Sequence, residues 1–106
     1  MANFLLLYSG GGMPANEAET KAVMAAWDAW FHKLGGDLVD GGNPFTPKAK
    51  TVSADGKVAD GPVGGMASGY SIIEADSLDA AVKMAKGCPV LQGGAKLSVY
   101  ETLHVM

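Results

Sequence analysis

Two groups of residues have the types and the spacing for acid–base chemistry, and the first lies on a predicted helix. Asp28 and His32 are four residues apart, so their side chains share one helix face. A carboxylate beside a histidine near a helix C-terminus favours the imidazolium and can orient the ring as a general base. Exposed ion pairs at this spacing are also common and weak, and we favour such a solvated surface pair.

The second group lies on the predicted last strand. Ser98, Tyr100 and His104 share one face, because alternate residues of a strand point the same way. We expect Tyr8 and Tyr70 to join them across the sheet. Such a pocket would bind a small planar or carboxylate ligand, with His104 as the acid or base. Tyr100 and His104 lie about 13 Å apart along the strand, so they can bracket a ligand without forming a dyad. The same face also suits a dimer interface, where tyrosines are enriched, and we favour this alternative.

Other kinds of site have little support in the sequence. The two histidines and the single cysteine are far apart and have no metal-ligand spacing. The glycine runs contain no phosphate-binding or dinucleotide-binding motif, so we expect no cofactor. Glu74 and Glu101 could each act as a single base, but no second carboxylate is spaced to pair with either. The net charge of −3 gives no basic surface for nucleic acid.

The cellular location is predicted from the cysteine count and the hydropathy pattern. A single cysteine excludes an internal disulfide, which suits a reducing compartment, and Cys88 is predicted to be a buried structural thiol. The apolar run at the N-terminus is too short for a signal peptide. No stretch approaches the roughly 20 apolar residues of a membrane span. We therefore expect a soluble, cytoplasmic protein that binds no membrane.

Hydrophobic periodicity and turn residues predict six main elements in one domain that spans residues 1–106. Predicted strands cover residues 4–8, 38–39, 70–75 and 96–105, and predicted helices cover residues 17–34 and 78–86. Asn16 and Ser77 are the expected N-caps, and Gly35 ends the first helix. The first helix should bury one stripe, formed by Val23, Trp27, Trp30 and Leu34.

Between the second and third of these strands the sequence predicts an insertion. Residues 51–58 read as a β-hairpin whose Asp55-Gly56 pair forms a two-residue turn. Residues 64–68 are rich in glycine and small residues and are predicted to form a mobile loop. Without the insertion the order is βαββαβ, which predicts an α+β ferredoxin-like fold with both helices on one face of an antiparallel sheet.

The second face of that sheet is not covered by any predicted element. The residues proposed to line it are mostly apolar or aromatic: Phe4, Leu6, Tyr8, Tyr70, Ile72 and Tyr100. A monomer rarely exposes so much apolar surface. We therefore expect a homodimer in which the sheets of two copies meet.

Several motifs, in order, resemble those of the YCII-related proteins, in the branch named for an Asp-Gly-Pro-Phe motif. They are Leu5-Leu6-Leu7-Tyr8, Gly41-Gly42-Asn43-Pro44-Phe45, Asp60-Gly61-Pro62 and Gly69-Tyr70-Ser71-Ile72-Ile73, and they span nearly the whole chain. The resemblance implies a dimeric α+β barrel related to muconolactone isomerase. It also implies a lyase-like or isomerase-like enzyme that acts on small organic acids or ring-derived metabolites.

The chain departs from that family at the positions that would carry catalysis. Val63 stands where the branch name expects phenylalanine. Better-characterised relatives have a histidine on the first helix and an aspartate after the first strand, and these positions correspond to Ala25 and to Ser9 or Gly10. The alternative function is therefore a non-catalytic protein that binds a small ligand, or another partner, in the same dimeric barrel.

Overall fold

Strands and helices follow one another along the chain as the hydrophobic pattern predicts. The computed structural model describes residues 2–10 and 16–103. Its elements are β1 (Ala2–Ser9), α1 (Glu17–Leu34), η1 (Gly35–Asp37), β2 (Leu38–Asp40), β3 (Lys50–Val52), β4 (Val58–Asp60), β5 (Ala67–Ala75), α2 (Leu78–Ala85), η2 (Pro89–Gly93) and β6 (Lys96–Glu101). The last strand is shorter than predicted, and residues 104–106 lie outside the described part.

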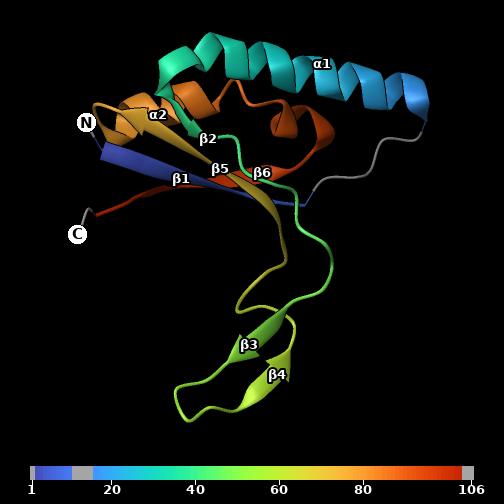
Figure 1. Cartoon of the computed structure of the whole chain (residues 1–106), viewed down its shortest axis with the longest axis vertical. Helices are drawn as coiled ribbons and strands as arrows, with labels where there is room; N and C mark the ends of the chain where they lie inside the picture. Colours follow the sequence, from blue (N-terminus) through green and yellow to red (C-terminus); the bar gives the residue numbers. More distant parts are fainter. Residues whose placement is uncertain (1, 11–15, 104–106) are drawn as a thin grey trace.

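Four of the strands form one antiparallel sheet in the order β2-β5-β1-β6. Both α-helices lie on the same side of this sheet, and no described helix covers the opposite side, which we call the open side (Figure 1). The strands β3 and β4 form a separate two-stranded sheet. The structure therefore confirms the α+β ferredoxin-like βαββαβ fold with a hairpin insertion.

Local sequence signals set the ends of both helices. The side chain of Asn16 accepts a hydrogen bond from the Glu19 backbone N–H at 2.9 Å, and Ser77 does the same for Ala80 at 3.1 Å. Each cap satisfies a backbone donor that the first turn leaves without a partner. Gly35, with φ +55°, ends α1. These caps confirm the predictions made from sequence.

The first strand corrects the prediction of which residues line the open face. Phe4, Leu6 and Tyr8 are buried on the side of the helices, together with Ile73 of β5. The register pairs the intervening residue Leu5 with both Ile72 and Tyr100, and it pairs Leu7 with Tyr70 and Ser98. These partners therefore form the open face. β1 is apolar on both of its faces, so alternation alone could not decide which one meets the helices.

The first helix packs on the sheet only through its C-terminal half. Trp30 and Leu34 are buried, and Trp27 is half-buried. Val23, the fourth residue of the predicted stripe, is 42% exposed. Residues 16–25 are all exposed, because this half of α1 extends beyond the sheet (Figure 1). The predicted stripe is thus wrong at its N-terminal end.

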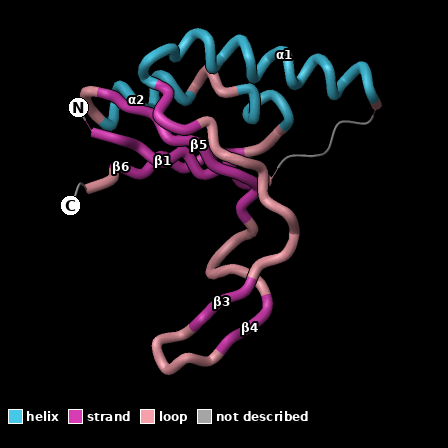
Figure 2. The backbone as a smooth tube through the Cα atoms, viewed as in Figure 1, coloured by secondary structure: helices cyan, strands magenta, loops and turns pink. Residues whose placement is uncertain are grey.

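The hairpin insertion projects away from the rest of the molecule (Figure 2). Ser53 N–H donates to the Lys57 carbonyl and Gly56 N–H donates to the Ser53 carbonyl, and Gly56 has φ +87°. This is a longer loop built on a turn with one left-handed glycine, and the predicted two-residue turn is wrong. The predicted loop at 64–68 is also too long, because β5 already begins at Ala67.

Candidate functional site

A tight turn at residues 40–45 contacts side chains on both faces of the sheet. The backbone N–H of Phe45 donates to the Ser68 carbonyl at 2.8 Å, and Pro44 forms an isolated bridge with Gly69. Gly42 has φ +72°, and a Cβ at this position would overlap the carbonyl of Tyr70. The turn therefore requires glycine, for its backbone angle and for its close approach to β5.

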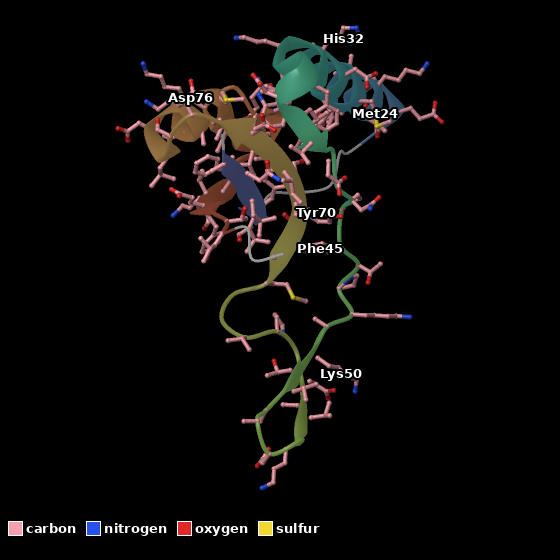
Figure 3. The ribbon with its side chains drawn as sticks, turned by 60° about the vertical axis from the view of Figure 1, so that its left-hand side comes forward. Met24, His32, Phe45, Lys50, Tyr70 and Asp76 are labelled. Atoms are coloured by element: carbon pink, nitrogen blue, oxygen red, sulfur yellow. The ribbon has the colours of Figure 1, made fainter. Side chains whose placement is uncertain are left out.

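On the open side, this turn assembles what we call the Asp40–Tyr70–Phe45 cluster. One carboxylate oxygen of Asp40, Oδ1, accepts a hydrogen bond from Gly42 N–H at 2.8 Å. The hydroxyl of Tyr70 donates to the other, Oδ2, at 3.5 Å, the long limit of a hydrogen bond. The rings of Phe45 and Tyr70 stack with their centroids 5.9 Å apart, and both lie at the base of the hairpin (Figure 3).

The accessibility of this cluster suits a ligand. Asp40 and Phe45 are exposed and Tyr70 is half-buried. A fixed carboxylate, a phenol and an exposed aromatic ring can together contact a small hydroxylated ring by hydrogen bonding and stacking. The cluster thus combines an anionic acceptor, a hydrogen-bond donor and a stacking surface.

On the helix side, the same turn is anchored by a buried chain of hydrogen bonds. The Tyr8 hydroxyl donates to Ser71 Oγ at 2.7 Å, and the Ser71 hydroxyl donates to the Gly41 carbonyl at 2.8 Å. The Tyr8 ring packs edge-on against Trp27 with a centroid separation of 5.5 Å. This chain connects β1, β5 and the 40–45 turn and fixes where the turn lies.

The titratable groups of the buried chain are held in their neutral forms. Burial raises the pKa of the Tyr8 hydroxyl far above its usual range, although the hydrogen bond with Ser71 opposes the shift. Burial also raises the pKa of the Cys88 thiol, which interacts with Tyr8. Cys88 is buried, as predicted from sequence. The neutral Tyr8 phenol takes part in the hydrogen bonds that position the turn. Neither this phenol nor the neutral Cys88 thiol is a ready nucleophile at neutral pH.

The structure separates the tyrosines that the sequence placed in one pocket. Tyr8 faces the helices, whereas Tyr70 and Tyr100 face the open side, so the predicted pocket formed by all three is wrong. Tyr70 and Tyr100 lie on either side of β1 and are offset by two residues, which puts them about 12 Å apart. Tyr100 is 53% exposed. His104 lies outside the described residues.

The other predicted acid–base pair is not part of this cluster. Asp28 and His32 are both exposed on α1, and His32 lies on the upper side of the helix, away from Tyr70 and Phe45 (Figure 3). Among the described residues, no group of three or more histidine, cysteine or acidic side chains is placed to hold a metal ion. No helix in the described ranges is long and apolar enough to cross a membrane.

Two surface hollows lie on the helix side. One, of about 260 Å³, lies between α1 and α2 and is lined by Trp30, Lys33, Leu34, Asp37, Lys83, Met84 and Gly87. The other is an open apolar groove of about 410 Å³ along α2, η2 and β6. Neither contains a residue of the Asp40–Tyr70–Phe45 cluster.

The sequence analysis missed two residues of this site, Asp40 and Phe45, and named Phe45 only as part of a family motif. Asp40 directly follows a short predicted strand and precedes the Gly41-Gly42-Asn43-Pro44 turn. An aspartate often accepts a hydrogen bond from the backbone two residues later at such a turn, and it does so here. That local pattern indicated the position of Asp40 but not its meeting with Tyr70, which is 30 residues away.

The comparison with solved structures gives a match over nearly the whole chain. The fold is similar to that of 5-chloro-2-hydroxyhydroquinone dehydrochlorinase (TftG) from Burkholderia phenoliruptrix AC1100, which was solved in complex with 2,5-dihydroxybenzoquinone. The TM-score is 0.57 at 22% sequence identity, and the match covers 97% of this chain and 95% of that chain. No family model and no curated protein matches the sequence. The likeness establishes a shared fold.

Proposed function

We propose that this protein is a lyase- or isomerase-type enzyme that acts on small hydroxylated ring compounds or on the acids derived from them. The observation that carries the proposal is the Asp40–Tyr70–Phe45 cluster, in which a held carboxylate lies next to a phenol and an exposed ring. TftG is named for a hydroxylated ring substrate and was solved with a hydroxylated ring compound, 2,5-dihydroxybenzoquinone. The fold shared with TftG supports this substrate class. From the motif resemblance, we also propose that the chain is a member of the YCII-related family.

The chemistry of the cluster follows from the two oxygens of Asp40. In base-catalysed elimination or isomerisation, a base removes a proton from the substrate, and a hydrogen-bond donor stabilises the negative charge that develops. In elimination that charge departs with the leaving group, and in isomerisation the proton returns at another carbon. Asp40 is the proposed base, because the N–H of Gly42 fixes its orientation. The long contact between Tyr70 and Asp40 can open to admit a substrate hydroxyl, and Tyr70 then donates its own proton in a hydrogen bond to the substrate.

The remaining residues bind the substrate or hold the 40–45 turn in place in this proposal. The ring of Phe45 stacks on the substrate, and Tyr100 contacts the far end of a larger ligand on the same open face. Tyr8 and Ser71 hold the turn from the helix side. His104 remains a proposed ligand contact at the end of the last strand, and Asp28 and His32 remain a proposed surface pair.

The proposal includes a homodimer formed through the open face of the sheet. This face carries Leu5, Leu7 and Ile72, and no described helix covers it (Figure 1). Removing apolar surface of this kind from water contributes about 25 cal/mol per Å². A second copy that packs face to face would remove it and would also limit the access of water to the cluster at the edge.

A ligand screen followed by turnover assays tests the function. We expect hydroquinone or catechol to raise the melting temperature of the protein, and Phe45→Leu to reduce the shift. Absorbance spectra of the ligands that bind, recorded over time with enzyme, then report conversion. Binding followed by conversion supports an enzyme, and binding without conversion across the panel supports the ligand-binding alternative. If no hydroxylated ring or small carboxylate binds, the proposed substrate class is wrong.

A further inference from the structure

Within the described residues, the two strands of the hairpin insertion pair with no strand of the main sheet. We call residues 46–66 the hairpin arm; it contains β3 and β4, which pair only with each other in the described sheets. The arm extends from the sheet on the side opposite to the helices (Figures 1 and 2). An isolated two-stranded hairpin is at best marginally stable in water, and this one has three paired positions. It therefore needs a surface to pack on.

The apolar side chains of the arm are exposed in the single chain. Val52 and Val58 lie opposite each other in the register and are 69% and 59% exposed. Val63 and Met66, nearer the base, are also exposed. Two valines facing each other across strands form a compact apolar patch, and this patch marks the face of the arm that is available for a contact.

The size of the chain shows how far its extended shape departs from that of a compact monomer. Its accessible surface is 7555 Å², against about 5500 Å² for a compact monomer of 10.8 kDa. Its radius of gyration is 15.3 Å, against about 13 Å for a compact domain of this length. The excess of about 2000 Å² is comparable with the area that each partner buries in an obligate homodimer.

We propose that the hairpin arm clasps a second copy of this chain. The arm extends on the same side as the open sheet face, so a copy that packs on this face lies directly beside it (Figure 1). The valine patch then packs on the partner, and the Asp40–Tyr70–Phe45 cluster at the base of the arm is closed by the partner's surface. This inference rests on the dimer of the proposed function and adds that the site is incomplete in one chain.

The charge distribution agrees with a contact between copies. The arm carries three lysines and two aspartates, a net charge of +1, so the rest of the chain carries −4. Lys50 pairs with Asp60 at 3.1 Å within the arm. A weakly basic arm on an acidic body favours docking of the arm on the body of another copy.

Site-specific cross-linking tests the clasp directly. A photoactivated cross-linker is attached to the arm tip in Ala54→Cys, with Lys83→Cys on α2 as the matched control on the helix side. Cys88 is 2% exposed and should not be labelled. Treating the unsubstituted protein with the same cross-linker checks this. We expect illumination to give a covalent dimer from the arm tip and little from α2. A dimer in solution that gives no cross-link from the arm tip overturns the clasp.

The dimer dissociation constant of arm variants provides the second test. Val52→Ser with Val58→Ser should raise this constant at least tenfold, whereas Ala59→Ser on the other face of the hairpin should leave it nearly unchanged. An unchanged constant in the valine variant overturns the clasp, even if the protein is a dimer. A monomer at low micromolar concentration contradicts both the clasp and the proposed dimer. Failure to bind a hydroxylated ring contradicts only the proposed function, because the cross-link and the dissociation constant are measured without ligand.

Discussion

Ser71 should contribute more to stability than the tyrosine that donates to it, because it is the middle member of the buried chain from Tyr8 to Gly41. Ser71 is fully buried, accepts one hydrogen bond and donates another. Tyr8→Phe removes the first donor and leaves the Ser71 hydroxyl bonded to the Gly41 carbonyl. Ser71→Ala removes both bonds and leaves the buried Tyr8 hydroxyl with the thiol of Cys88, a weak hydrogen-bond partner, in place of the Ser71 hydroxyl. Tyr8→Phe therefore removes one of these two hydrogen bonds, whereas Ser71→Ala removes both.

The expected free energies follow from that difference. A typical hydrogen bond contributes about 1 kcal/mol, which is our estimate for Tyr8→Phe. Leaving a buried polar group without a partner costs about 1–3 kcal/mol. Adding the lost bond to the half-buried Gly41 gives about 2–4 kcal/mol for Ser71→Ala. The double variant lacks both hydroxyls, so no buried hydroxyl loses its partner. We therefore expect a loss of about 2 kcal/mol in the free energy of unfolding and a coupling energy near −2 kcal/mol.

Urea unfolding of the wild type, the two single variants and the double variant measures this cycle. All four are compared at one protein concentration, because dimerisation makes the apparent stability depend on concentration. Tryptophan fluorescence is a suitable signal, since Trp27 packs on Tyr8. Additive effects, or a larger loss for Tyr8→Phe than for Ser71→Ala, would refute the proposed direction of the hydrogen bonds.

Three further predictions concern the turn, the helix packing and the alkaline range. Gly42→Ala should destabilise the protein by at least about 2 kcal/mol more than Gly64→Ala, because the two glycines have nearly equal φ and only Gly42 lies against β5; equal losses would show that the close approach is unimportant. Trp30→Ala should cost about 3–5 kcal/mol and Val23→Ala less than about 0.5 kcal/mol, because Trp30 is buried and donates to the Met84 carbonyl while Val23 is exposed; denaturation midpoints that reverse this order would contradict the helix packing. Stability should fall as the pH rises above about 10, because the unfolded state then loses the tyrosine proton that buried Tyr8 keeps. Tyr8→Phe should flatten this decline in unfolding curves taken from pH 8 to 11, and an unchanged slope would count against it.

The fold could be predicted from sequence because several independent local signals agree. Asn16 and Ser77 cap helices whose ends are also marked by hydrophobic period, and β6 alternates between polar and apolar residues. These are local properties of the chain, and tertiary contacts did not override them. The order of the elements then left few arrangements of the sheet.

The site was only partly predictable because it depends on contacts between distant residues. Tyr70 was expected to contact a ligand, but its contact with Asp40 depends on the irregular pairing of β2 with β5. The wrong face of Tyr8 has a different cause: Leu5 and Leu7 are as apolar as Phe4 and Leu6, so the pattern is symmetric. The overhang at Val23 could not be foreseen, since helical period says nothing about where the sheet ends.

The binding of hydroquinone to Asp40→Asn, measured by isothermal titration calorimetry, tests the central claim most directly. Asn keeps the size of the side chain and removes its charge, and Asp76→Asn makes the same change at an exposed position away from the cluster. A hydrogen bond to a charged group is worth about 1.5–3 kcal/mol, so we predict at least about a tenfold weaker affinity for Asp40→Asn. Asp76→Asn should bind like the wild type. Equal affinity in Asp40→Asn and the wild type would contradict the assignment of the site to the Asp40–Tyr70–Phe45 cluster.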